Sequence, residues 1–289
     1  MKQFLHKLSG SIRRFITITP LREKKVIVLA FLFVTFLTSC EKVITLDLNE
    51  AEKKYVIEAI ITDQPSTAKV QITQTKNFDE DNTFPGVSGA TVTIKENGGA
   101  TTTLTETSQG IYQNAALVAV SGKTYSLSVN INGSVFTASC IMPQRVNLDT
   151  VFVTDELLFT DTRKIVNVEF QEPSGRGNNY RFIQYVNDHK EEEIMIQNDD
   201  YTDGRNVNAK LFFFAEDDDS TALIHSGDTV KVDMLCIDQP IYKYWFSLWR
   251  SSLGGNQQAT PSNPVSNIQG GALGYFSAHT LQTKEMVVP

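Results

Sequence analysis

The pattern that most restricts the fold of this 289-residue chain is a pair of alternating apolar and polar runs joined by Asn132-Gly133. The runs cover Thr124–Ile131 and Ser134–Cys140. An Asn-Gly pair between two such runs is the strongest short-range signal for a β-hairpin, because a type I′ turn needs positive φ at both central residues. The sequence therefore predicts an antiparallel hairpin here and a sheet to which it belongs.

Similar short runs precede this hairpin. They have the alternation and the Val, Ile, Thr and Tyr content typical of strands, and Gly, Asn and Pro separate them. Seven or eight short strands at this spacing, without a helical period, indicate a β-sandwich. We therefore predict a mainly β chain in which residues 51–145 form an Ig-like or transthyretin-like β-sandwich, preceded by a tether and first strand at 40–50. The other predicted strands are Tyr55–Thr62, Ala68–Thr75, Ala90–Lys95 and Thr101–Thr107.

A second β-rich domain is predicted for residues 146–289, after a boundary within Pro143–Thr150. Its strand-like runs are separated by loops rich in Gly, Asn and Asp. Glycines spaced through the apolar run before the last strand indicate bulges or close backbone packing. The predicted strands are Arg163–Gln171, Asn179–Asn187, Asn206–Ala215, Asp228–Cys236 and Leu281–Val288.

One helix is predicted, over residues 239–253. Asp238 can cap its N-terminus, Pro240 suits its first turn, and Gly254-Gly255 can end it. Apolar and aromatic side chains cover most of its circumference, which is typical of a helix buried on most sides. We therefore expect the helix to fill the core of the second domain. The alternative is an aromatic ridge that contacts a partner or a ligand, formed by Tyr242, Tyr244, Trp245 and Trp249.

The N-terminus has the features of a secretory signal. A basic region ends at Lys24-Lys25, the apolar stretch Val26–Leu37 follows, and Thr38-Ser39-Cys40 forms a small-residue cleavage site that ends in cysteine. As a helix the apolar stretch would extend about 18 Å, against the roughly 30 Å of a hydrocarbon core. Residues 1–39 are therefore predicted to be a cleaved lipoprotein signal peptide, and Cys40 is predicted to be the lipid attachment site.

Cleavage at this site would make the chain more acidic. It removes seven of the 26 basic residues and one of the 33 acidic residues, so the formal charge changes from −7 to −13. Such a charge argues against nucleic acid as a partner, because phosphates are bound by basic patches. The expected contact with the membrane is through the N-terminal lipid, and durable anchoring requires more than one acyl chain.

Two cysteines remain besides Cys40, namely Cys140 and Cys236. Each lies at an apolar position of a strand-like alternation. A lone cysteine in such a position is more often a small buried hydrophobic residue than half of a disulfide. A disulfide between them is the less favoured alternative, because they fall in different predicted domains.

The sequence contains no signature of catalysis or metal binding that we recognise. The three histidines after Cys40 lie far apart and outside any HExxH pattern, and neither a GxSxG elbow nor a GxxxxGK[ST] loop is present. The acidic run Asn198–Gly204 fails as an EF-hand, because Tyr201 and Lys210 fall where oxygen ligands are required. We therefore expect no cofactor, no metal and no enzymatic activity. A hydrolase with an unrecognised pair of carboxylates is the lesser alternative.

The first predicted domain contains a glycine-punctuated series of motifs. Val87–Ile94 is followed by Gly110-Ile111-Tyr112 and then by Gly122–Leu127. This series resembles carboxypeptidase-regulatory-like and related prealbumin-like domains. The resemblance implies a non-catalytic β-sandwich.

Taken together, the motifs of the mature chain resemble one family, the Bacteroidetes lipoproteins of domain of unknown function 4249 (DUF4249). The resemblance implies an outer-membrane lipoprotein, often encoded beside a TonB-dependent receptor, and it supplies no catalytic residues. It leaves open whether the protein faces the surface or the periplasm. The motifs are the signal ending at Cys40, Leu46-Asp47-Leu48, the sandwich series, the helix residues Tyr242, Tyr244 and Trp245, and the ending Asn263–Ala278.

One further pattern concerns modification. Asp219-Ser220-Thr221 resembles the three-residue O-glycosylation motif of Bacteroidetes, and it lies in an acidic run expected to form an exposed loop. Ser220 is therefore a candidate glycosylation site.

These features lead to two main hypotheses. The first is a lipid-anchored, non-enzymatic protein that acts as an accessory or ligand-binding subunit of a TonB-dependent receptor uptake system. The second is a surface structural or adhesive lipoprotein with no role in transport.

Overall fold

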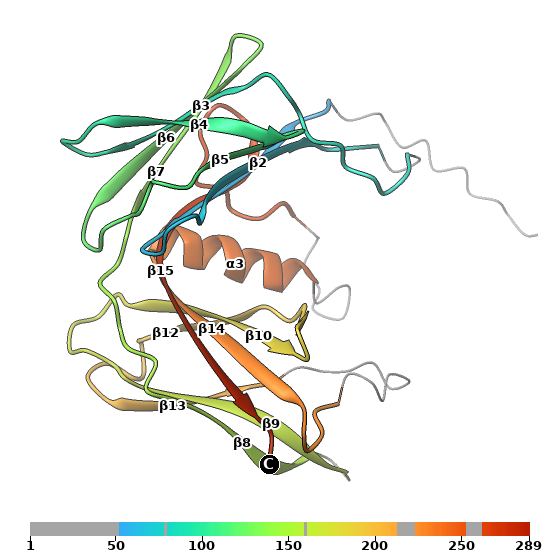
Figure 1. Ribbon diagram of the computed structural model, residues 1–289, viewed down its shortest axis with the longest axis vertical. Coiled ribbons are helices and arrows are strands. Elements are labelled where there is room, and N and C mark those ends of the chain that lie inside the picture. Colours follow the sequence, from blue (N-terminus) through green and yellow to red (C-terminus); the bar gives the residue numbers. More distant parts are fainter. Residues whose placement is uncertain (1–51, 78–79, 159–160, 213–222, 253–261) are drawn as a thin grey trace, which may run out of the picture. The chain divides into compact units, whose positions relative to one another are not determined.

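The computed structural model describes residues 52–77, 80–158, 161–212, 223–252 and 262–289 (Figure 1). The predicted signal peptide, the lipid attachment site Cys40, the strand expected within 41–49 and the candidate glycosylation site Ser220 all lie outside these ranges. Within them the chain forms fifteen strands and one α-helix, so the prediction of a mainly β fold is confirmed. All of these elements belong to one unit, Glu50–Pro289.

The first seven strands follow the predicted pattern closely. They are β1 (Tyr55–Thr62), β2 (Ala68–Gln74), β3 (Thr91–Glu96), β4 (Thr101–Ser108), β5 (Ile111–Asn114), β6 (Thr124–Ile131) and β7 (Ser134–Ile141). The hairpin of β6 and β7 has Asn132 at φ 50° and Gly133 at φ 84°, and Ile131 pairs with Ser134. The predicted tight turn with positive φ at both central residues is therefore confirmed.

The second half of the chain adds eight strands and the helix. They are β8 (Thr150–Leu158), β9 (Asp161–Gln171), β10 (Asn179–Val186), β11 (His189–Lys190), β12 (Met195–Asn198), β13 (Asn206–Leu211), β14 (Thr229–Ile237), α3 (Gln239–Ser252) and β15 (Leu273–Val287). β8 was not predicted, and neither were the short strands β5, β11 and β12. β8 pairs on one side with β9, and most of its side chains are half-buried or exposed, so it lacks the clear apolar alternation of a core strand.

Twelve of the strands form one sheet and three form another. The long sheet has the order β11-β10-β14-β15-β1-β2-β5-β4-β3-β6-β7, with β12 paired to β10, and the short sheet has the order β13-β9-β8. β15 is the strand that joins the two halves of the long sheet (Figure 1). It pairs in parallel with β1 through Leu273–His279 and then antiparallel with β14 through Thr280–Val287.

The start of β15 corrects one prediction. The last strand was expected from Leu281, but it begins eight residues earlier, at Leu273. The end of the glycine-containing run, Leu273–Ala278, is therefore part of the strand, while Gly270 and Gly271 precede it. Gly274 has φ +97°, and a Cβ there would overlap the backbone carbonyl of Ile57 on β1. The prediction of close backbone packing is therefore confirmed at Gly274, and this packing is what admits the run into the sheet.

Two apolar cores lie on one face of the long sheet. The first core is built from β1–β7 and includes Phe276 and Ala278 of β15. The second core lies between the short sheet and the strands β10, β14 and β15, and it includes Met286 as a partly buried member. Cys140 is buried in the first core and Cys236 in the second, and both thiols are free. The interpretation of both cysteines as small buried hydrophobic residues is confirmed.

The helix is where it was predicted, but it does not fill the second core. None of its residues belongs to that core, which the short sheet closes instead. α3 packs on the opposite face of β10 and β15, where Ile241 joins Leu235 and Ile237 in a small third cluster (Figure 1). Asp238 precedes the helix, and its Oδ1 accepts a hydrogen bond from the Ile241 amide at 3.1 Å, as expected of an N-cap.

Candidate functional site

The four aromatic residues singled out on the helix are divided between two hollows. Tyr242 and Trp249 line a groove of about 260 Å³ that α3 forms with β12 and β13. Tyr244 is buried and packs against Tyr275 of β15, while Trp245 lines a different pocket. They therefore do not form the single ridge that was proposed as the alternative to a buried helix.

The second of these hollows, which we call the Arg181 pocket, has a volume of about 270 Å³. It lies on the face of the long sheet that is turned away from both cores, next to α3. Five elements and one loop contribute to it, which no single stretch of sequence could indicate. Its lining residues are Ile60, Thr62, Thr67, Arg181, Ile183, Asp233, Leu235, Ile237, Trp245, Tyr275, Ser277, His279 and Leu281.

Arg181 supplies the positive charge of this pocket. Its guanidinium carbon lies 3.4 Å from the centroid of the Trp245 ring, in a cation–π stack. The side chain as a whole is half-buried, while its Nε is fully enclosed and has no hydrogen-bond partner. No described residue accepts a hydrogen bond from the guanidinium or forms an ion pair with it. Burial lowers the pKa of Arg181, but an arginine stays charged at any physiological pH.

Three aromatic rings hold this arrangement in place. The ring centroids of Tyr244 and Tyr275 are 4.7 Å apart, those of Trp245 and Tyr275 are 5.3 Å apart, and those of Tyr244 and Trp245 are 5.4 Å apart. These are the separations of favourable aromatic pairs. Burial raises the pKa of Tyr244 to about 12, so its phenol stays protonated at neutral pH. The Trp245 ring is thus fixed by its neighbours, and it fixes the plane of the guanidinium in turn.

His279 and Ser277 contribute neutral polar groups. The Oγ of Ser277 and the Nδ1 of His279 are 2.8 Å apart. Burial and the charge of Arg181 lower the pKa of His279 to about 4, so the imidazole is neutral at pH 7. This pair lacks the third group that orients the base in nucleophilic catalysis, because no described carboxylate bonds to the ring. A histidine with so low a pKa is also a weak general base.

Asp233 is the acidic residue of the lining. Its Oδ1 accepts a hydrogen bond from the Thr283 hydroxyl at 2.6 Å. It makes no ion pair with Arg181, although both residues line the same pocket. The opposite charges in the pocket are therefore not joined to each other.

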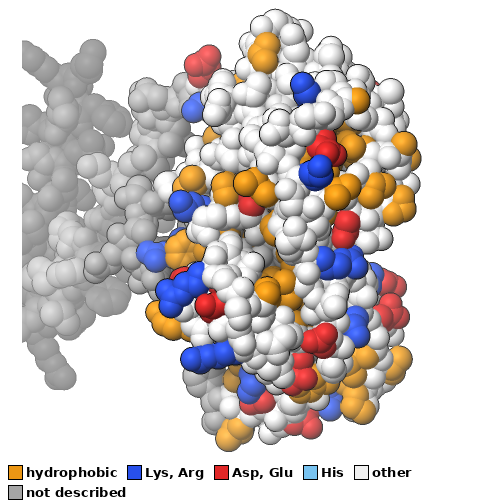
Figure 2. Space-filling model, turned by 90° about the vertical axis from the view of Figure 1, so that its left-hand side faces the viewer, with side chains coloured by type: hydrophobic (Ala, Val, Ile, Leu, Met, Phe, Trp, Pro, Cys, Tyr) orange, Lys and Arg blue, Asp and Glu red, His pale blue; other side chains and the backbone are white. Residues whose placement is uncertain are grey.

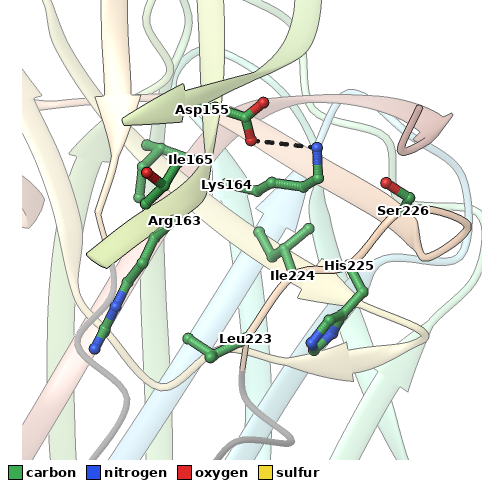
Figure 3. Close-up of a pocket in the computed structure, with 9 residues that line it drawn as sticks. Asp155, Arg163, Lys164, Ile165, Leu223, Ile224, His225 and Ser226 are labelled. Carbon is green, nitrogen blue, oxygen red and sulfur yellow. Dashed lines mark hydrogen bonds and ion pairs between the residues drawn. The ribbon is translucent and has the colours of Figure 1, made fainter. Parts of the chain in front are cut away.

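A larger hollow of about 310 Å³ lies beside β8 and β9 (Figure 3). Two of its charged residues, Lys164 and Asp155, form an ion pair at 3.3 Å, which Figure 3 shows at one edge, while Arg163 forms no ion pair with a described residue. The segments 159–160 and 213–222, which adjoin its lining residues in the sequence, lie outside the described residues. This hollow therefore gives a weaker basis for a binding site than the Arg181 pocket does.

The acidic run that failed as an EF-hand has a structural role. Asp199 is buried and accepts hydrogen bonds from the amides of Gly177 at 2.8 Å and Asn178 at 3.0 Å. Asp203 accepts one from the amide of Gly175 at 2.7 Å. Within the described residues no three His, Cys, Asp or Glu side chains are placed to hold a metal ion. These carboxylates fasten one loop to another.

Charge on the surface is mixed. Figure 2 shows basic and acidic side chains interspersed over one face, without a continuous patch of either sign. Among the described helices, none has the length and apolar character needed to cross a membrane.

The fold and the pocket together define a mainly β protein with a partly open pocket, lined by one arginine and one aspartate, at the strand that joins its two cores. A family model described as "Domain of unknown function (DUF4249)" matches residues 41–285. The chain therefore belongs to the DUF4249 family, as its motifs indicated. No match to a curated protein was found.

Sequence reasoning did not find Arg181. In β10 the odd-numbered residues alternate with the buried Tyr180 and Phe182, so they have the pattern of a solvent-facing row. Only the packing of α3 over that row turns it into a pocket wall. The one signal available was the aromatic helix, whose Trp245 does reach this site.

Proposed function

We propose that the protein is a lipid-anchored, non-enzymatic binding protein of the outer membrane, an accessory or ligand-binding subunit of a TonB-dependent receptor uptake system. The observation that carries the binding role is the Arg181 pocket, which is partly open to solvent, largely apolar and supplied with an unpaired cation. Small-molecule sites have this character, with apolar walls and a few polar groups that fix orientation.

The anchoring role is supported by the sequence before the described residues. A basic region, a short apolar stretch and Cys40 form the layout of a lipoprotein signal. Replacing Cys40 by alanine should abolish incorporation of labelled fatty acid and release the protein from the membrane fraction. Continued labelling of the Cys40→Ala variant would disprove anchoring at this residue.

The role in uptake is tested by affinity purification from gently solubilised membranes. We expect a β-barrel receptor to copurify with the wild-type protein, and we expect a deletion strain to lose uptake of the corresponding nutrient. Repeated absence of any such receptor, with unchanged uptake in the deletion strain, would contradict the proposal.

The alternative is a structural or adhesive protein, and one feature favours it. β7 is the last strand of the long sheet, and its Val135 and Ile141 side chains are 53% and 54% exposed. Exposed apolar side chains on an edge strand are suited to pairing with another chain. This alternative predicts altered attachment between cells in the deletion strain, with normal uptake. The charged substitution Val135→Lys should reproduce that change in attachment.

A further inference from the structure

The guanidinium of Arg181 is half-buried and has no counter-ion among the described residues. Charges in protein interiors are normally paired, because an unpaired one loses its hydration without compensation. The same protein contains a paired example. Arg145 bonds to Asp63 through Nε at 3.1 Å and Nη2 at 3.0 Å, and its Nη2 also bonds to the carbonyl of Leu281 at 2.8 Å. The chain can therefore satisfy an arginine at this strand, and at Arg181 it does not.

Because Nε is fully enclosed, the geometry leaves the edge of the guanidinium formed by Nη1 and Nη2 for a ligand. Trp245 occupies one face of the guanidinium plane, with its ring centroid 3.4 Å from Cζ. An arginine fork held flat in this way presents parallel N–H donors along its edge. Such an edge is complementary to a carboxylate, which accepts two of these hydrogen bonds at once.

The rest of the lining favours an apolar ligand body. Ile183, Leu235, Ile237 and Leu281 form apolar wall, and Ser277 and His279 add neutral hydrogen-bonding groups. The volume of about 270 Å³ is just below the roughly 300–1,000 Å³ usual for small-molecule sites. The ligand must therefore be small.

The charges in the lining argue against a dianion. One cation faces the pocket, and Asp233 lines it as well. Glu58 also acts on Arg181 through its negative charge. Phosphate and sulfate dianions would meet about twice the repulsion from these carboxylates that a monocarboxylate meets, and they would find few of the donors that they require.

We propose that the Arg181 pocket binds a small monocarboxylate, with the carboxylate on the guanidinium edge of Arg181 and the hydrocarbon body against Leu235, Ile237 and Leu281. This inference rests on the proposed binding function, for which it names the class of ligand. It makes Arg181 a binding residue and Trp245 the residue that positions it.

The test is a direct binding titration of the purified full chain in detergent. The sequence has two tryptophans, so the Trp249→Phe variant leaves Trp245, which touches the guanidinium, as the fluorescent reporter. The probes are acetate, butyrate, hexanoate, hexanamide and inorganic phosphate. We expect saturable binding of the carboxylates that strengthens along the series by about fourfold per methylene, until the pocket is full. Hexanamide and phosphate should bind at least about tenfold more weakly than hexanoate, since hexanamide lacks the negative charge and phosphate lacks the hydrocarbon body.

Variants add a second, independent readout. Arg181→Met should weaken hexanoate at least about tenfold, because the charge and both hydrogen bonds are lost. Arg181→Lys keeps the charge without the fork and should lie between the wild type and Arg181→Met. Arg145→Met removes an arginine outside the pocket and should leave hexanoate binding unchanged.

Three results would overturn the assignment. The first is the absence of saturable carboxylate binding up to about 10 mM, which is beyond the usual range of weak specific binding. The second is equal binding of hexanoate and hexanamide. The third is tighter binding of phosphate than of any carboxylate. The comparison of ligands decides the question even if an Arg181 variant does not fold, because it uses a protein in which Arg181 is unchanged. They are also independent of the uptake role, because carboxylate binding without a copurifying receptor would leave the ligand class intact and contradict only the receptor.

Discussion

Two arginines on either side of Leu281 lie in opposite environments. The backbone of Leu281 belongs to one region, since its amide donates to Asp63 at 2.9 Å and its carbonyl accepts from Arg145 at 2.8 Å. The side chain of Leu281 belongs to the other region, where it lines the Arg181 pocket. On the first side every charged group has a partner. On the second side the cation has an aromatic face and no acceptor among the described residues.

The difference separates a structural contact from a candidate binding site. The Arg145–Asp63 pair connects the segment after β7 to the end of β1 and to β15, at the boundary between the two cores. Its removal should lower stability. The Arg181 guanidinium contributes no such contact, so its removal should affect binding far more than folding. The following predictions test this contrast in stability, from the largest expected effect to the smallest.

The largest loss of stability is expected from a substitution in β15, because this strand contributes to both cores. Gly274 has φ +97°, and a Cβ there would overlap the carbonyl of Ile57 in the neighbouring strand. Gly274→Ala should therefore destabilise the protein by more than about 3 kcal/mol, or prevent folding, through backbone strain and steric overlap. The measurement is denaturant-induced unfolding. Gly271→Ala is the matched control, because Gly271 has φ +90° with open space around it and should cost only about 1–2 kcal/mol. Equal effects of the two variants would show that β15 does not need close contact with β1.

The free energy of unfolding should fall in acid because of His279, which lines the Arg181 pocket. Burial and the charge of Arg181 lower its pKa from 6.5 to about 4 in the folded protein, so the unfolded chain takes up the proton first as the pH falls. Stability contributed by the neutral imidazole is therefore present above pH 6.5 and lost between about pH 6.5 and 4. The loss is on the order of 3 kcal/mol at about 1.4 kcal/mol per pKa unit.

This pH effect is measured as the difference between the wild type and His279→Gln in unfolding free energy from pH 7.5 to 4.5. Other groups titrate in the same range, but they are common to both proteins and cancel in the difference. A constant difference over this range would mean that His279 is not buried next to Arg181 as described.

The Arg145–Asp63 ion pair should make a measurable contribution to stability. Asp63 accepts hydrogen bonds from Arg145 and from the Leu281 amide. The Asp63 side chain is 19% exposed and the Arg145 side chain is 39% exposed. Asp63→Ala should cost about 1–3 kcal/mol, because the Arg145 guanidinium loses its carboxylate partner and the part-buried Leu281 amide loses its acceptor. Arg145→Met should cost about 1 kcal/mol, since a partly exposed ion pair is weakened by solvent.

A double-mutant cycle isolates the pair itself. The combination of Asp63→Ala and Arg145→Met should cost less than the sum of the single substitutions, because the same contact is lost only once. Strict additivity would show that the contact contributes nothing to stability.

The smallest effect on stability is expected at Arg181. Replacing an unpaired, half-buried cation by a hydrophobic side chain of similar length removes its desolvation penalty, so Arg181→Met should be neutral or stabilising, within about 1 kcal/mol. Thermal and denaturant unfolding measure this directly. A loss larger than that of Arg145→Met would reverse the contrast and make Arg181 a structural residue.

Most of the strands could be predicted because their signals are local. β1 and β6 have the predicted bounds, and the Asn132-Gly133 turn has positive φ at both residues. Side-chain alternation and turn chemistry act over a few neighbouring residues, so they can be read from the sequence. The same reasoning placed α3, from its cap at Asp238, and both buried cysteines.

The features that were missed depend on contacts between distant segments. The helix was expected in a core, yet its apolar circumference did not say which face of which sheet it would cover. β15 was predicted only over its second half, because pairing with β1, far away in the sequence, is what extends it to Leu273.

The sequence by itself thus determined most of the strands, the tight hairpin turn, the helix and membership of the DUF4249 family. The tertiary structure decided that β15 joins two cores and that Arg181, Trp245 and Tyr275 meet in one pocket. The physical reason is that the alternation of apolar and polar residues indicates which side chains are buried, whereas the contacts of each side chain depend on how distant elements pack. Whether a half-buried arginine has a counter-ion is a property of that packing alone.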